Sequence, residues 1–265
     1  DANGGLTGIE NLTGLEKLYL DDNPLIADIS LLENLTSLTE LHLAGCIGIT
    51  NDTQWTDLKT LAFLDLTGCN QLTTLDLSQL TVLQDLKLAG CTDLTEIILT
   101  NCSQLTRLDE NNTFDGLINL ETLTLNYCSM LNNDDIVSLS DLTSLKKLAL
   151  TGCASLTDLS PIENLTNLQK IYLGQCSGLT DTGISFLASL PSLVFVNLSG
   201  CAQLTNLAPL IANTHFVGTG CELHVEGING VDIPGSSIYQ QLCTLKQRGV
   251  KVTPCPNSCT GVTCP

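Results

Sequence analysis

Aromatic side chains are scarce in this chain. They make up 4% of its 265 residues, and there is a single tryptophan, Trp55. A glycan-binding function therefore has little support, because sugars need several rings on which to stack. Hydrophobic residues nevertheless reach 43% of the chain, and leucine dominates them. A core of aliphatic side chains favours thin repeated layers over one thick globular core.

Positive charge is scarce as well. Ten Lys and Arg residues stand against 28 Asp and Glu residues, which gives a net charge of −18. Such a field repels nucleic acids and anionic membranes, so we expect neither as a partner. No apolar run approaches the roughly 18 to 20 residues that cross a bilayer, so we predict no membrane insertion.

Catalytic motifs are missing from the sequence. The histidines, His42, His215 and His224, fall on different repeats, and no pair has the spacing of metal ligands. We interpret His42 and His224 as exposed surface residues. The phosphate-binding, serine-hydrolase and zinc-protease motifs are absent, and the Asp-rich loops lack the spacing of a calcium loop. We therefore predict no enzyme activity, no cofactor and no metal site.

The chain does have one phrase that recurs about nine times, Leu-x-x-Leu-x-Leu-x-x-Cys. Clear copies occupy residues 38–46, 145–153 and 168–176. Within each copy the second and third apolar residues alternate with period two, which predicts a short strand with one face inward. A fixed repeat of this length is typical of a solenoid, in which each coil buries its apolar face against its neighbours.

The spacing of the phrases is nearly, but not entirely, regular. The second apolar residue of each phrase serves as a marker: Leu18, Leu41, Leu64, Leu86, Leu123, Leu148, Ile171, Val196 and Leu223. Most steps span about 22 to 27 residues, but the step from Leu86 to Leu123 spans about 37.

Two further phrases, centred on Leu75 and Ile97, follow a marker after only about 11 residues. A coil needs about 20 residues or more, so we interpret these phrases as extended segments on the opposite side of their coils. An insertion of about half a unit near residues 97–116 then accounts for the long step. In the alternative register Ile97 is itself a marker, and the sequence leaves both registers open.

On these phrases, the chain resembles a leucine-rich repeat protein over about residues 6–225. The N-terminal repeats, with Asn-Leu-Thr-Gly-Leu at 11–15 and Asn23 in the turn, resemble the bacterial internalin type. From Cys46 onward, Cys replaces Asn, as in the cysteine-containing subfamily. The resemblance implies an α/β solenoid with parallel strands on a concave face and short helices, 3₁₀ turns or extended segments on the convex face. It also implies a non-enzymatic module that binds proteins.

The predicted domains are a solenoid of about nine coils over residues 1–225, a helix–strand cap over 226–254 and a cysteine-rich tail over 255–265. In the cap, Ser237 and Gln240 give a capping-box signal. We expect Gly249 to end the helix, so that residues 250–252 can pair as a closing strand. The tail weakly resembles the opening of small cysteine-rich modules in large extracellular proteins, and the sequence leaves open whether the natural chain continues beyond it.

Thirteen cysteines form two groups. One group recurs at the ninth position of the phrase and predicts a ladder of buried structural thiols. Its members are Cys46, Cys69, Cys91, Cys102, Cys128, Cys153, Cys176 and Cys201. The other group gathers near the end of the chain and predicts disulfides of unknown pairing, which favour a secreted or cell-surface protein. Its members are Cys221, Cys243, Cys255, Cys259 and Cys264; zinc is the alternative, although the tail lacks the C-x2-C pairs common in zinc sites.

Outward strand positions of the later repeats combine lysines with aromatic residues. Such residues gather at the centres of protein interfaces, although strand faces also accept them for pairing and solubility alone. The residues predicted to contact a protein partner are Tyr127, Lys146, Lys147, Lys170, Tyr172 and Phe195. We therefore predict a monomeric module that binds a protein through its concave strand face. The alternative is a structural spacer within a larger adhesin.

Overall fold

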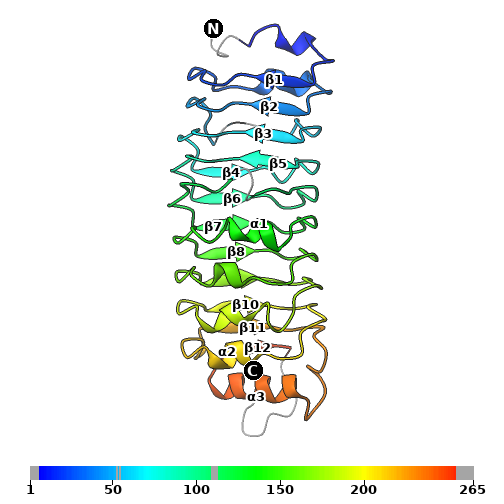
Figure 1. Ribbon diagram of the computed structural model, residues 1–265, viewed down its shortest axis with the longest axis vertical. Helices are drawn as coiled ribbons and strands as arrows, with labels where there is room; N and C mark the ends of the chain where they lie inside the picture. The colour runs from blue at the N-terminus through cyan, green and yellow to red at the C-terminus, as the bar shows by residue number, and fades with distance from the viewer. Residues whose placement is uncertain (1–5, 52, 54, 109–112, 255–265) are drawn as a thin grey trace. The chain divides into compact units, whose positions relative to one another are not determined.

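The computed structural model describes residues 6–51, 53, 55–108 and 113–254. The chain forms two compact units, Asp1–Met130 and Leu131–Pro265, which we call unit 1 and unit 2 and describe separately. In each unit the backbone winds through short parallel strands joined by turns and brief helices (Figure 1). The repeat solenoid predicted from the phrase is confirmed.

The first sheet of unit 1 is built by the earliest phrases. Its parallel strands are, in sheet order, β1 (Lys17–Tyr19), β2 (Glu40–His42), β3 (Phe63–Asp65) and β5 (Asp85–Lys87). The leucine at the centre of each strand faces the core, and the residues on either side of it face outward. The chain returns through turns and through the 3₁₀ helices η1 (Ile9–Asn11) and η2 (Ser30–Asn34).

A second sheet in unit 1 contains β4 (Thr74–Asp76), β6 (Glu96–Ile98) and β7 (Thr122–Thr124). Leu75 pairs with Ile97, and Ile97 pairs with Leu123. The two half-spaced phrases therefore lie outside the first sheet, as predicted. The expectation that Leu123 continues the sheet of Leu86 is wrong. The alternative register is confirmed in one part, because Ile97 leads to Leu123, but Leu86 still continues the sheet of Leu64.

This change of sheet follows from where the leucines fall. From Leu64 to Ile97 a phrase recurs every half coil, so both sides of these coils carry the apolar alternation that a strand requires. The next strand is centred on Leu123, about one coil after Ile97, and it therefore stays in the second sheet. Residues 109–112 of the predicted insertion lie outside the described part of the chain.

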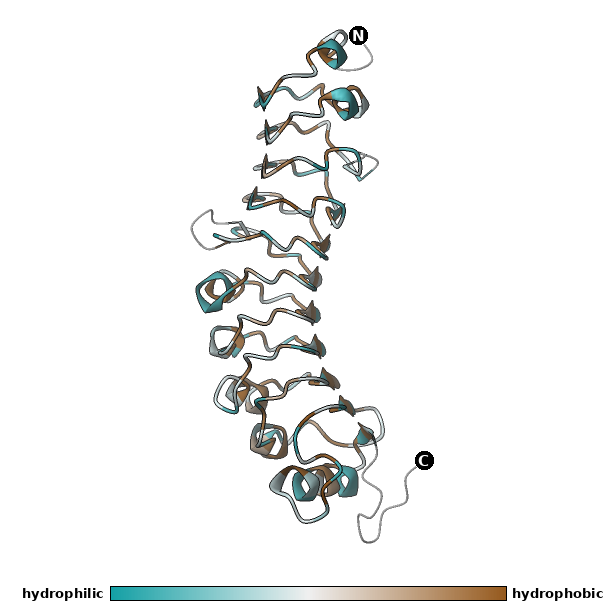
Figure 2. Ribbon diagram, turned by 90° about the vertical axis from the view of Figure 1, so that its right-hand side faces the viewer, coloured by the Kyte–Doolittle hydropathy of each residue, from teal (hydrophilic) through white to brown (hydrophobic). Residues whose placement is uncertain are grey.

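Unit 2 carries one run of parallel strands. In order these are β8 (Lys147–Ala149), β9 (Lys170–Tyr172), β10 (Phe195–Asn197), β11 (Glu222–His224) and β12 (Lys251–Thr253). Short helices occupy the other side of the unit (Figure 2): α1 (Asn133–Val137), η3 (Ser160–Ile162), η4 (Ser185–Ala188) and α2 (Ala208–Ala212). Strands and helical turns thus take separate sides within this unit.

The predicted helix and closing strand near the end of unit 2 are both present. Helix α3 (Ser237–Gln247) precedes β12, which pairs in parallel with β11. The helix cap is Ser236 instead of the expected Ser237, because the Ser236 hydroxyl accepts the hydrogen bond from the Tyr239 amide. Gly249, with a φ of 88°, follows the end of the helix.

The eight cysteines at the ninth phrase position are buried and carry free thiols. Cys176 Sγ donates to the Leu150 carbonyl at 3.1 Å, and Cys201 Sγ donates to the Leu173 carbonyl at 3.0 Å. Each acceptor is the last leucine of the preceding phrase, so the thiol joins its own coil to the one before. This bond satisfies a buried polar group at a position that must otherwise be apolar.

Polar side chains also join successive coils at the turns. Asn133 Oδ1 accepts the amides of Thr157 and Asp158, while Asn133 Nδ2 donates to the Thr157 hydroxyl. Asn51 and Asp181 form the same bridges to the coils that follow them. Each of these side chains gives two backbone amides of the next coil an acceptor, and one of those amides, that of Thr74, begins β4.

Replacing Asn133 with alanine should therefore destabilise unit 2. Two backbone amides and one hydroxyl lose their partner, and we expect the free energy of unfolding to fall by about 1 to 3 kcal/mol. Urea denaturation measures the change. Asn164→Ala, at an exposed position with no side-chain hydrogen bond recorded in the structure, is the matched control and should stay within about 0.5 kcal/mol of wild type. Equal effects of the two substitutions would contradict the bridging role.

Alkaline pH should destabilise the fold through thiols such as Cys201. Burial raises the pKa of Cys201 from 9.0 to about 12. Between these values the thiol ionises in the unfolded chain but stays protonated in the folded one, so the free energy of unfolding falls as pH rises. Urea unfolding at several pH values in this range should give a shallower decline for Cys201→Ala than for wild type. Identical slopes would show that this thiol does not contribute.

Candidate functional site

The outward side chains of unit 2 form two rows across its strands. The first residue of each strand belongs to one row, and the third residue to the other. The first row is Lys147, Lys170, Phe195, Glu222 and Lys251. The second row is Ala149, Tyr172, Asn197, His224 and Thr253.

Rings from neighbouring strands are in contact across these rows. The ring centroids of Tyr172 and Phe195 lie 4.7 Å apart, and those of Phe195 and His224 lie 5.2 Å apart. Lys147 Nζ lies 5.8 Å from the Tyr172 centroid, within reach of a cation–π contact. The ring surface of unit 2, which we define as Lys147, Tyr172, Phe195 and His224, is thus continuous across four strands. All four side chains are partly accessible to solvent.

A carboxylate borders this surface at its far end. Glu222 Oε1 accepts from Lys251 Nζ at 2.6 Å, and Glu222 Oε2 lies 3.8 Å from His224 Nε2. The hydrogen bond from Lys251 lowers the pKa of Glu222. The Glu222 charge is therefore already matched by the ammonium group of Lys251.

Lysines in strand register usually face an acid in this structure. Lys17 is opposite Glu40, Lys87 is opposite Asp65, and Lys251 is opposite Glu222. The corresponding nitrogen–oxygen distances are 2.5, 3.9 and 2.6 Å.

Lys147 and Lys170 depart from this pattern, because they are opposite one another. Among the residues that the structure describes, neither has an ion pair with a carboxylate. Like charges directly opposite on adjacent strands are unfavourable. The two lysines thus concentrate positive charge beside Tyr172, in a chain whose net charge is −18.

The other residues predicted to bind a partner lie nearby or elsewhere. Lys146 is exposed and comes directly before β8. Tyr127 belongs to unit 1 and is 45% exposed, but it is not on a strand. It lies in the turn after β7 with a φ of 60°, at the phrase position where Gly90 and Gly152 adopt the same left-handed conformation. Its expected place on an outward strand position is therefore wrong.

The sequence analysis missed a second ring surface, in unit 1. Tyr19 stacks on His42 with centroids 4.3 Å apart, His42 lies 4.7 Å from Phe63, and Lys87 Nζ lies 5.4 Å from the Phe63 centroid. The sequence nevertheless contained the pattern that predicts this surface, because all four residues occupy outward positions of the alternating strands. The expectation of an exposed His42 is wrong, since its side chain is only 16% exposed between the two rings.

Glu40 is at the centre of this second surface. Its carboxylate accepts from Lys17 Nζ, from the Tyr19 hydroxyl at 2.8 Å and from His42 Nε2 at 2.9 Å. These hydrogen bonds lower the pKa of Glu40 to about 2. The unit 1 surface therefore carries its own anion, placed against a lysine and a tyrosine.

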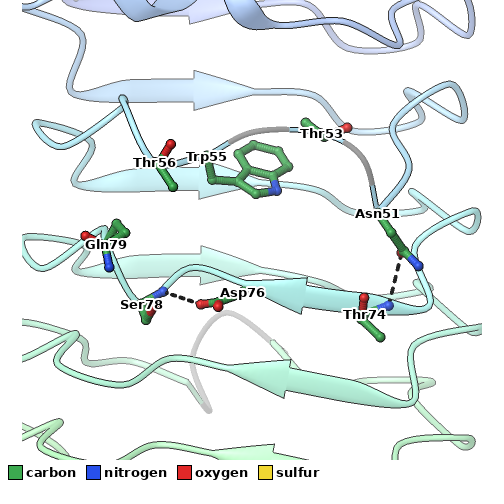
Figure 3. Close-up of a pocket in the computed structure, with 8 residues that line it drawn as sticks. All are labelled: Asn51, Thr53, Trp55, Thr56, Thr74, Asp76, Ser78 and Gln79. Carbon is green, nitrogen blue, oxygen red and sulfur yellow. Dashed lines mark hydrogen bonds between the residues drawn. The ribbon is translucent and has the colours of Figure 1, made fainter.

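A cavity in unit 1 lies beside β4 (Figure 3). Its volume is about 330 Å³, and Trp55, Thr74 and Asp76 are among the residues that line it. Trp55 is only 5% exposed, so its ring packs in the core and offers little stacking surface. Asp76 accepts the Ser78 amide at 2.9 Å and thereby caps its own turn. The Asp76 carboxylate is therefore engaged in local structure.

The late cysteines predicted to form disulfides have different outcomes. For Cys243 the disulfide stays a prediction, because the late cysteines other than Cys221 that could pair with it fall outside the described residues. Cys221 carries a free, buried thiol that donates to the Val217 carbonyl at 3.3 Å, so its predicted disulfide is wrong. Its Sγ finds an acceptor four residues earlier and needs no partner sulfur. The predictions for Cys255, Cys259 and Cys264 fall outside the described residues. In the part of the chain that is described, no group of His, Cys, Asp and Glu could hold a metal ion.

The repeated strands define a solenoid whose surface features are rows of side chains. The family model of leucine-rich repeats in two copies matches residues 13–62, and that of the BspA-type leucine-rich repeat region in six copies matches residues 125–221. Together these matches span more than half of the sequence. The chain belongs to the leucine-rich repeat proteins.

Solved structures with a similar backbone come from bacteria and eukaryotes. Internalin C2 of Listeria monocytogenes is 26% identical, with coverage of 78% of this chain and 81% of that chain and a TM-score of 0.41. An internalin (inlF) of the same bacterium is 23% identical, with coverage of 92% and 75% and a TM-score of 0.42. The yeast Rad7 and Elc1 complex gives 18% identity, coverage of 97% and 76%, and a TM-score of 0.48. No curated protein sequence matches the chain. Among the described residues, no helix is long and apolar enough to cross a membrane.

Relieving the opposed lysines should stabilise the protein. Lys170→Glu places an acid opposite Lys147, as at the three paired lysines, and we expect the free energy of unfolding to rise by about 0.2 to 1 kcal/mol. Thermal and urea unfolding provide the measurement. Lys59→Glu makes the same change of charge at an exposed position in unit 1 and serves as the control. A loss of stability in Lys170→Glu beyond that of the control would refute the unfavourable pairing.

Proposed function

We propose that this chain is a non-enzymatic recognition module that binds a protein through the strand face of unit 2. Leucine-rich repeat proteins are generally protein-interaction modules, and the membership of this chain supports that general role. The contact residues we assign are Lys147, Lys170, Tyr172 and Phe195, with Lys146 beside them.

One observation carries the proposal, namely the continuity of the ring surface of unit 2. Aromatic residues are few in this chain, yet Tyr172 and Phe195 are in contact with each other and flanked by cations. Interface centres are enriched in aromatic residues bordered by polar groups. Unit 1 gathers rings too, but there Glu40 already engages the neighbouring lysine and tyrosine, whereas no described carboxylate does so beside Lys147 and Lys170.

We further propose that the module acts outside the cell or on its surface. The cluster of late cysteines supports this, because disulfides form and persist in oxidising compartments. The free thiols of the ladder are compatible with it, because they are buried and hydrogen-bonded. The alternative function is a spacer within a larger adhesin, in which the strand face binds nothing.

Site-specific photo-cross-linking separates recognition from the spacer function. The full chain would carry a photoreactive phenylalanine at position 172 in one preparation and at position 164, on an exposed return segment, in another. Irradiation in the presence of extracellular proteins from the source should yield a discrete adduct from position 172 only. Wild-type protein in excess should suppress that adduct.

The double variant Lys147→Ala/Tyr172→Ala supplies the decisive competitor. We expect it to suppress the adduct far less than wild type, because it lacks a cation and a ring of the proposed surface. Adducts of equal yield from both positions, or equal competition by the variant, would favour the spacer.

A further inference from the structure

The opposed lysines of unit 2 lack the acid that faces every other lysine in described strand register. In those pairs the facing residue is Glu40, Asp65 or Glu222. At the Lys147–Lys170 pair the facing residue is a second lysine. The chain contains 28 acidic residues, so an acid at this position would be unexceptional. The folded protein instead retains an unfavourable pairing on an accessible strand face.

The Glu40 site in unit 1 shows how a carboxylate binds to such a face. There one carboxylate accepts from Lys17 Nζ and from the Tyr19 hydroxyl, two residues along the neighbouring strand. Unit 2 offers the same donor types, because Lys170 and Tyr172 are also the first and third residues of one strand. Lys147, opposite Lys170, adds a second ammonium group. These donors have no described carboxylate between them.

The surroundings restrict what an anionic ligand can be. Phe195 lies beside Tyr172 on one side, and Glu222 follows Phe195 in the same row. A ligand must therefore place its negative charge over the lysines and apolar groups over the rings. A long polyanion would instead run into Glu222 and the strongly negative field of the whole chain. A short acidic segment with an adjacent apolar residue fits both parts.

We propose that Lys147 and Lys170 bind a carboxylate of an acidic segment in the partner protein, while Tyr172 and Phe195 hold an apolar side chain next to it. This assignment rests on the proposed function, since it names the chemistry that the same face recognises. The ligand carboxylate makes to Lys147 and Lys170 the kind of contact that Glu40 makes to Lys17 in unit 1. Binding thereby relieves the repulsion between the two lysines.

Selection from a random peptide library displayed on phage tests this assignment with the full chain. Wild-type protein should enrich peptides in which Asp or Glu adjoins Phe, Leu or Trp. Lys147→Gln/Lys170→Gln should lose this enrichment. Lys17→Gln/Lys59→Gln makes the same change of charge in unit 1 and should keep it. Circular dichroism establishes that all three proteins are folded.

The best enriched peptide, labelled with fluorescein, then gives affinities by anisotropy. The Lys147→Gln/Lys170→Gln variant should bind this peptide at least about tenfold more weakly than wild type does. A peptide in which Asn or Gln replaces each Asp or Glu should bind wild type with the same reduced affinity. Raising the salt concentration should weaken binding to wild type, because the contact is exposed. Fragments of heparin serve as a parallel probe for a sulfated glycan.

Each remaining outcome overturns the assignment. If the enriched peptides contain no acidic residues, the proposed function stands, but the proposed carboxylate contact with the two lysines is refuted. Acidic peptides that still bind the double variant would place their site elsewhere. Heparin binding that depends on these lysines, with peptide binding unaffected, would identify a glycan ligand. Failure to enrich any peptide also refutes the acidic segment, while the cross-linking at position 172 decides the proposed function separately.

Discussion

Every coil of this chain must cover the leucines of the next, and the rest of the structure depends on that requirement. Most of the three-residue strands bury a single side chain, and an isolated coil would leave most of its leucines in water. Stacking buries the strand centres completely in nearly every coil. Thiols such as Cys176 then join neighbouring layers without admitting a polar group that lacks a partner. Outward side chains take no part in this packing and are free to vary.

The repeated phrase was sufficient to predict the strands, their parallel order and the burial of the cysteines. It did not decide which sheet each strand joins, because Leu86 and Ile97 satisfy the same pattern and only pairing distinguishes them. Local hydrogen bonds were also difficult to foresee. Ser236 caps α3 although Ser237 has the sequence signal, and Cys221 keeps a free thiol although it lies among the late cysteines.

The candidate surface could be predicted in outline from alternation alone. Lys147, Lys170, Tyr172 and Phe195 were expected on one face, and the structure brings them onto adjacent strands. The prediction for Tyr127 was wrong, because the residue before each cysteine of the ladder belongs to a turn and has a positive φ. The markers already align the strands, since Leu148 pairs with Ile171 and Leu41 pairs with Leu64. The distances between outward side chains were not available from the sequence, so the ring contacts between Tyr19, His42 and Phe63 could not be established from it.

The two sheets of unit 1 have a consequence for how such a protein can diversify. Between Leu64 and Ile97 both halves of a coil carry the same leucine pattern, and each half contains a strand. Unequal recombination between half-coil segments would preserve the packing of leucine on leucine. It would nevertheless transfer the next strand from one sheet of unit 1 to the other, as happens between Leu86 and Leu123. A half-coil step thus changes which part of a coil displays its outward side chains, while the leucines keep the same packing.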